Sequence, residues 1–84
     1  MMTLERLRAA RSRTIGTKQT AKALTRHEAE AVYVAADAEE RVTREIRRLC
    51  AERNVEVIMV ETMAALGKAC GIEVGAATAA ILKQ

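Results

Sequence analysis

The segment AVYVAADAEERVTREIRRLCAERNVEVIMV, residues 31–60, decides the fold of this 84-residue chain. It opens on a continuous apolar run with β-branched residues, 31–36, which is typical of a buried strand. A helix follows over residues 39–53, and a second apolar run predicts another strand over residues 55–60. The apolar side chains of the helix recur at i, i+4, i+7 and i+8, which is one face. They are Val42, Ile46, Leu49 and Cys50.

The other faces of this helix carry opposite charges four residues apart, a spacing that stabilises helices. The pairs are Glu40 with Arg44, Arg41 with Glu45, and Arg48 with Glu52. We interpret the arginines as a solvated face rather than a second binding patch.

Toward the C-terminus, Thr62 is a suitable N-cap for a helix over residues 63–70. Its inward face consists of Met63, Leu66 and Cys70. Gly71 is the natural residue to end this helix, because glycine adopts the left-handed conformation without strain. A last strand is predicted over residues 75–82, built of small residues that let helices pack close to a sheet.

Toward the N-terminus, Thr3 can cap a first helix that ends near Ser12. Thr14 and Ile15 then form a very short strand that stops at Gly16. A second helix is predicted from Thr17, as N-cap, to about Thr25, with Ala21 and Leu24 facing inward.

Helices and strands therefore alternate along the whole chain. This order predicts an α/β fold, a three-layer α-β-α sandwich with a mixed sheet in which the short first strand pairs antiparallel. We expect residues 1–84 to form a single domain, since the 9.2 kDa chain has room for no more.

Composition excludes several classes of protein. Tyr33 is the only aromatic residue, so stacking of bases on aromatic platforms is not available. No apolar run approaches the ~20 residues needed to cross a bilayer, and we expect no membrane association. The start of the chain lacks the apolar core of a signal peptide, which favours a cytoplasmic protein.

Catalytic and metal sites are also not predicted. No phosphate-binding glycine loop is present. The lone His27 cannot complete a zinc site with Cys50 and Cys70, which we interpret as small buried hydrophobic residues. No nucleophile, base and orienting residue can be assembled, so we expect neither an enzyme nor a cofactor.

Charge is distributed unevenly. Residues 1–26 carry seven Lys/Arg and one acidic residue, whereas residues 27–84 carry seven basic and ten acidic residues. Within the basic end, Lys18 would oppose the positive dipole at the start of a helix, which hints at another role. Lys18 and Gln19 can read nucleic-acid base edges, and Lys22 can hold a phosphate. An ordinary charged helix start remains the alternative.

The late loop, residues 71–75, sets Ile72 and Val74 on either side of Glu73 and between two glycines. The two apolar side chains either tuck under the edge of the sheet or stay exposed to meet a partner.

Both segments resemble one known family, the kink-turn RNA-binding ribosomal protein superfamily, and are most similar to its short bacterial members. The resemblance runs essentially from end to end. It is carried by IGTKQTAKA at residues 15–23 and LGKACGIEVGAA at residues 66–77.

The resemblance implies a four-stranded mixed sheet in an α-β-α sandwich and a kink-turn ligand. That ligand is an RNA duplex bent at a bulge flanked by tandem sheared G·A pairs. The motif that begins at Gly16 would enter the groove at the G·A pairs, and the late loop would pack against an extruded base. We add Arg13 and Lys68 as RNA backbone contacts. The candidate RNA-binding residues are Arg13, Gly16, Thr17, Lys18, Gln19, Lys22, Lys68, Ile72, Glu73 and Val74.

Two positions depart from the family motif, in which Asn and Glu stand where this chain has Lys18 and Gln19. Gln loses the charge that accepts strongly from guanine N–H groups, and Lys adds attraction to phosphate. We therefore expect steeper salt dependence, with discrimination of the G·A pairs resting more on Lys18.

The partner would be a ribosomal or regulatory RNA with a kink-turn, or the ribosome, bound by a monomer. The alternative function is a ribosome-associated protein-interaction module with an incidental basic N-terminus.

Overall fold

A computed structural model describes residues 3–83, in which four helices alternate with four strands. The helix boundaries are α1 Thr3–Ala9, α2 Thr17–Thr25, α3 Glu40–Arg53 and α4 Met63–Ala69. The strand boundaries are β1 Arg13–Ile15, β2 Ala29–Ala35, β3 Glu56–Val60 and β4 Thr78–Leu82.

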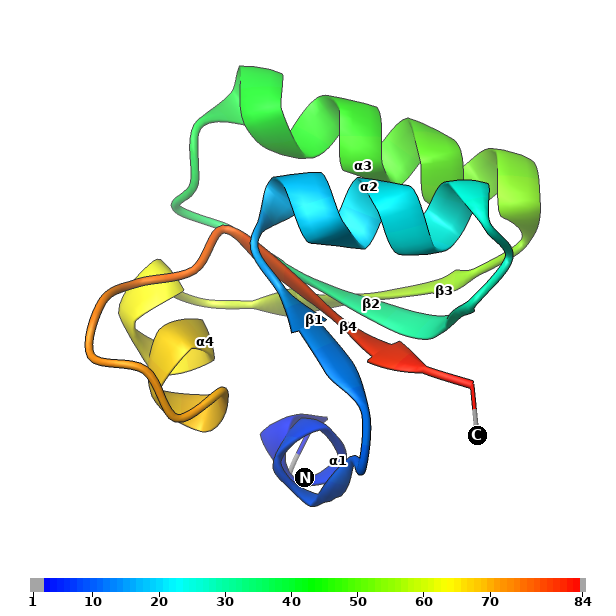
Figure 1. Ribbon diagram of the computed structural model, residues 1–84. Helices are drawn as coiled ribbons and strands as arrows, with labels where there is room; N and C mark the ends of the chain where they lie inside the picture. Colours follow the sequence, from blue (N-terminus) through cyan, green and yellow to red (C-terminus); the bar gives the residue numbers. More distant parts are fainter. Residues whose placement is uncertain (1–2, 84) are drawn as a thin grey trace.

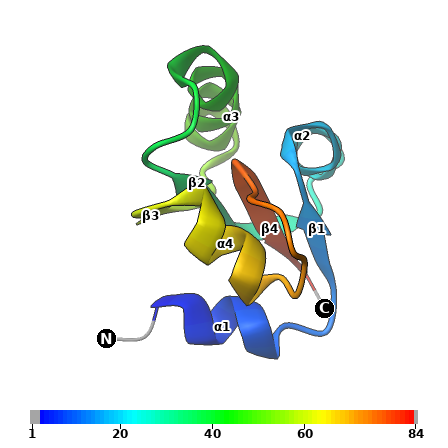
Figure 2. The same ribbon diagram turned by 90° about the vertical axis from the view of Figure 1, so that its left-hand side faces the viewer.

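The strands form one mixed sheet in the order β1-β4-β2-β3. β2 and β3 run parallel, whereas β4 runs antiparallel to both of its neighbours, β1 and β2. Helices α2 and α3 cover one face of the sheet, and α1 and α4 cover the other (Figures 1 and 2). The predicted α-β-α sandwich, its mixed sheet and its antiparallel first strand are confirmed.

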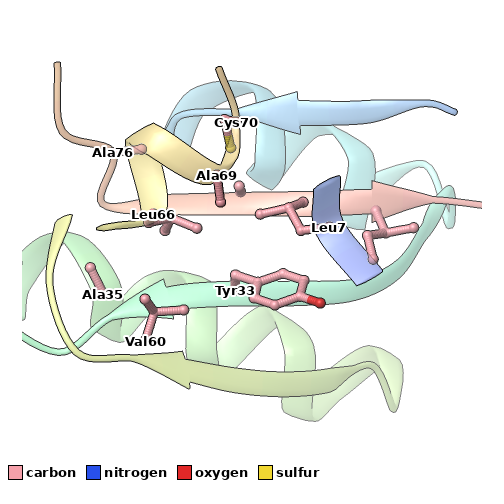
Figure 3. Packing of buried hydrophobic residues seen from close by; sticks show 10 residues of the cluster. Leu7, Tyr33, Ala35, Val60, Leu66, Ala69, Cys70 and Ala76 are labelled. Atoms are coloured by element: carbon pink, nitrogen blue, oxygen red, sulfur yellow. The ribbon is translucent and has the colours of Figure 1, made fainter. Parts of the chain in front are cut away.

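Each face of the sheet carries its own hydrophobic cluster. Tyr33 and Leu66 lie in the cluster beneath α1 and α4, and Tyr33 is fully buried there (Figure 3). Leu24 and Ile46 lie in the cluster beneath α2 and α3. Because side chains alternate along a strand, β2 and β4 supply both clusters. The small Ala79 and Ala80 of the central strand let helices approach from either side.

Local signals account for most of the elements. The apolar stripe of α3 packs onto the sheet through Ile46 and Cys50. On its outer face Glu40 pairs with Arg44 and Glu52 with Arg48, as predicted, but Arg41 pairs with Glu39 instead of Glu45. These exposed pairs each contribute little to stability.

The first helix is shorter than predicted. It ends at Ala9 instead of near Ser12, because Ala10 closes the last turn on Leu7 and the chain then extends to pair with β4. The Ser12 carbonyl accepts from the Leu82 N–H at 3.0 Å. Thr3 is the first residue of α1, and its predicted capping side chain lies outside what the structure describes.

Two strands begin two or more residues away from the predicted start. β2 begins at Ala29 rather than residue 31, because Ala29 pairs with Leu82 across an irregularity in the ladder. β4 begins at Thr78 rather than residue 75, because the preceding segment packs on α4, where the Ala76 N–H donates to the Met63 carbonyl at 3.0 Å.

Within residues 3–83 no helix combines the length and the apolar character that a membrane span requires.

Replacing Thr62 with Ala tests the cap of α4. The Thr62 hydroxyl accepts from the Ala65 N–H at 3.0 Å, as predicted, and its loss leaves that N–H without its acceptor. We expect the free energy of unfolding to fall by about 1 kcal/mol in urea denaturation. Thr25→Ala is the control, because the exposed Thr25 hydroxyl bonds only the Ala21 carbonyl within its own helix. Equal losses in both variants would contradict the capping role.

Candidate nucleic-acid interface

The two segments singled out in the sequence lie at the same end of the sheet. The start of α2 and the loop between α4 and β4 both lie on the left of Figure 1. β1 and β4 join them, because the Gly16 N–H donates to the Thr78 carbonyl at 2.8 Å. The site is therefore assembled by pairing between the first and last strands.

Gly16 makes the turn from β1 into α2. Its φ of 97° and ψ of 157° belong to a region that other residues rarely adopt. A side chain there would meet no atom within 4 Å, so the backbone conformation is what requires glycine. Gly16 is also the N-cap, and the prediction of Thr17 as N-cap is wrong. The Gly16 carbonyl takes the first helical bond, from the Thr20 N–H at 3.1 Å.

The start of α2 has no side-chain cap and no acidic residue in its first turn. The start of α4 differs, because Thr62 and Asp37 both accept from its backbone N–H groups. The uncapped N–H groups of α2 point outward with the positive end of the helix dipole, an arrangement that suits an anion.

At the start of α2 one side chain is buried and anchors the helix, whereas others are exposed to solvent. Thr20 is fully buried, and its hydroxyl lies 2.9 Å from the Thr14 hydroxyl, which ties the first turn of α2 to β1. Lys18, Gln19 and Lys22 are exposed. Two lysines and an amide are thus presented on a helix turn that is fixed from beneath.

The loop over residues 71–75 satisfies both of the interpretations offered for its apolar residues. Ile72 is half-buried against the cluster beneath α4, and its N–H donates to the Gly67 carbonyl at 3.1 Å. Val74 is 70% exposed, and Glu73 is exposed beside it. Gly71, with φ 82°, ends α4 as predicted. One apolar side chain thus anchors the loop, and the other is presented to solvent.

Gly67, in the middle of α4, shapes this loop, a role that was not predicted from the sequence. A Cβ atom on Gly67 would overlap the Val74 carbonyl oxygen, so the loop backbone lies directly on the helix. A glycine inside an otherwise apolar helix is unfavourable by itself, and that is the signal that could have revealed the contact.

The two remaining predicted contacts are placed differently. Lys68 is exposed on α4. Arg13 is half-buried at the start of β1, and its guanidinium donates to backbone carbonyls of Leu7, Arg8 and Cys70.

The cysteines are buried as predicted, Cys50 beneath α3 and Cys70 beneath α4. Burial raises the pKa of the Cys50 thiol to about 11, and burial also raises that of Cys70. Thiols held protonated in this way are poor nucleophiles. Among residues 3–83, no three His, Cys, Asp or Glu side chains gather where they could share a metal ion.

Comparison with known proteins places these features in a family. The model of the ribosomal protein L7Ae/L30e/S12e/Gadd45 family matches residues 2–84. An RNA-binding protein of Bacillus pumilus is 46% identical over 81 residues, which cover 96% of this chain and 99% of that protein. The large ribosomal subunit protein eL8 of Halobacterium salinarum is 44% identical over 68 residues, which cover 80% of this chain and 57% of that protein.

A solved structure supports the same relationship. The 15.5kD RNA binding protein of Giardia lamblia superposes with a TM-score of 0.85 at 26% sequence identity. The superposition covers 96% of this chain and 68% of that one.

Gly67→Ala tests the contact between α4 and the loop. Alanine is the better helix former, but its Cβ would displace the Val74 carbonyl. We expect a net loss of about 1–3 kcal/mol in unfolding free energy and shifted methyl resonances for Ile72 and Val74.

Ala64→Gly is the control for this variant, because Ala64 is exposed on the same helix and its change leaves the loop in place. It is expected to lower stability through helix propensity alone, with the loop resonances unchanged. A Gly67→Ala protein more stable than wild type would contradict the contact.

Proposed function

This chain belongs to the ribosomal protein L7Ae/L30e/S12e/Gadd45 family, and from that premise we propose that it binds RNA, without catalysis. More specifically, we propose that it recognises and stabilises kink-turns in a ribosomal or regulatory RNA. The observation that carries the proposal is the meeting of two surfaces at one end of the sheet. An uncapped helix start with exposed Lys18 and Gln19 lies beside a loop with an exposed Val74.

The start of α2 is proposed to enter the groove at the sheared G·A pairs. Gly16 has no side chain, so the backbone can approach the RNA closely. Lys18 would donate to guanine O6 and N7, and Gln19 would offer both a donor and an acceptor. Lys22 and Thr17 would hold phosphates alongside the outward N–H groups of the helix start.

The loop is proposed to cover the base extruded from the bulge. Val74 supplies an exposed apolar surface, and Ile72 fixes the loop beneath it. Glu73 would accept from base or sugar donors, and Lys68 would reach the RNA backbone. An unstacked base covered by aliphatic side chains needs no aromatic platform, which suits a chain whose only aromatic residue is buried.

A protein of this kind stabilises the kink because it binds the bent RNA more tightly than the extended RNA. The shift in the RNA equilibrium cannot exceed that difference in affinity. The pairing of β1 with β4 supports this role, because it joins the helix start to the loop and a surface of fixed shape discriminates between the two RNA shapes.

Fluorescence energy transfer across a labelled kink-turn duplex tests the proposal. We expect submicromolar protein to bring the two duplex ends together, because only the bent form matches the helix start and the loop. The control duplex has Watson–Crick pairs in place of the G·A pairs and should remain extended.

Weak binding to both duplexes that vanishes as salt is added would contradict kink-turn recognition and leave only an electrostatic patch. The interaction-module alternative predicts a different result. A protein would co-purify with this chain instead of RNA, and the basic N-terminal residues would be dispensable for that interaction.

Lys18→Ala tests the groove contact. We expect it to weaken kink-turn binding by about 1–3 kcal/mol and to relax the preference for G·A pairs, because the donor to guanine is lost. Lys83→Ala is the matched control, since Lys83 is exposed just beyond β4, at the end of that strand remote from the loop (Figure 1). Both variants lose one positive charge, so equal effects would argue against a specific role for Lys18.

A further inference from the structure

The side chain of Arg13 lies between the ends of two helices. Its Nη1 donates to the Leu7 carbonyl at 3.1 Å and to the Arg8 carbonyl at 3.4 Å. Its Nη2 donates to the Cys70 carbonyl at 3.1 Å. Leu7 and Arg8 belong to the last turn of α1, and Cys70 is the C-cap of α4. One guanidinium therefore bridges the C-terminal ends of both helices on this face.

Electrostatics favours this arrangement. The last carbonyls of a helix lack intrahelical partners and carry the negative end of its dipole. Two such ends converge here, and a cation between them is attracted by both. The planar guanidinium offers five donors in a fixed fork, which the compact ammonium of lysine cannot reproduce at separated acceptors.

The bridge lies directly against the start of the late loop. Gly71 follows Cys70 and turns the chain with φ 82°, and a Cβ on Gly71 would lie 3.9 Å from Arg13 Nη2. The next residue, Ile72, is the loop anchor described above. The backbone of Arg13 belongs to β1, which leads within three residues to Gly16. Arg13 thus touches the base of the loop through its side chain and continues into α2 through its backbone.

We infer that Arg13 is a positioning residue that holds the loop with Val74 at a fixed place relative to the start of α2. Arg13 then serves the RNA site through the Cys70 carbonyl rather than by the direct backbone contact expected from the sequence. The effect of Arg13 on RNA binding rests on the proposed function. The bridge between the two helix ends does not, because it is a property of the free protein.

The first arm of the test uses the free protein. Arg13→Lys keeps the charge and removes the fork. We expect amide hydrogen exchange at Gly71 and Ile72 to accelerate by about tenfold, because the loss of a charge-assisted hydrogen bond loosens the turn. Exchange in β2 should stay unchanged, which shows that the fold is intact. Arg11→Lys is the matched control on an exposed arginine of the same segment. Unchanged exchange at Gly71 and Ile72 in Arg13→Lys would overturn the inference.

The second arm measures kink-turn affinity in two double-mutant cycles. Val74→Ala alone should weaken binding about tenfold, through lost apolar contact. In the Arg13→Lys background the same change should cost much less, because the loop is already displaced. Lys22→Ala should instead cost the same in both backgrounds. A residue that only stabilises the fold would give additive effects with Val74 and Lys22 alike.

The outcomes separate the two proposals. If wild-type protein bends the RNA but Arg13→Lys binds equally well, or is additive with Val74→Ala, the positioning role fails and the proposed function stands. If wild-type protein fails to bend the RNA, the proposed function is wrong. The role of Arg13 in RNA binding is then also wrong, and only its role in holding the loop of the free protein is still tested by hydrogen exchange.

Discussion

The antiparallel pairing of β1 with β4 is the interaction on which the candidate site depends. It joins the first strand of the chain to the last, through Gly16 and Thr78 at one end and Ser12 and Leu82 at the other. The basic segment and the apolar loop lie far apart in the sequence, and of the three ladders within residues 3–83 this one links them. β4 also lies between the two hydrophobic clusters, so the same strand supports the core and the candidate interface.

Two glycines and one arginine shape the chain around the helix ends that carry the candidate site. Gly67 lets the loop lie on α4, and Gly16 turns the chain so that the first turn of α2 stays open. The Arg13 guanidinium donates to backbone carbonyls where α1 and α4 end. A chain of 84 residues has few residues that could form a binding site apart from the elements of the core. The candidate interface is therefore made from the ends of elements that also build the core.

The layers of the fold were predictable because their signals are local. The stripe of α3, the apolar run of β2 and the Thr62 cap each act within a few residues of sequence. The start of β4 and the end of α1 were misplaced because distant partners set them: Met63 for the segment before β4, and Leu82 for the chain after α1. Of the candidate site, the sequence indicated Lys18 and Gln19 on an exposed helix turn, but it left open which of Ile72 and Val74 is exposed. The carbonyls that Arg13 meets and the contact at Gly67 depend on packing that spacing does not encode.

The β1–β4 ladder makes formation of the candidate site depend on the order in which the chain is synthesised. The start of α2 is synthesised well before its supporting strand, because α3 and α4 both lie between α2 and β4 in the chain. Closing contacts of such long sequence separation is costly in entropy and comes late in folding. A nascent chain that lacks β4 therefore exposes a basic peptide without the rigid surface. The proposed shape-selective surface can therefore form only after β4 is available to pair with β1.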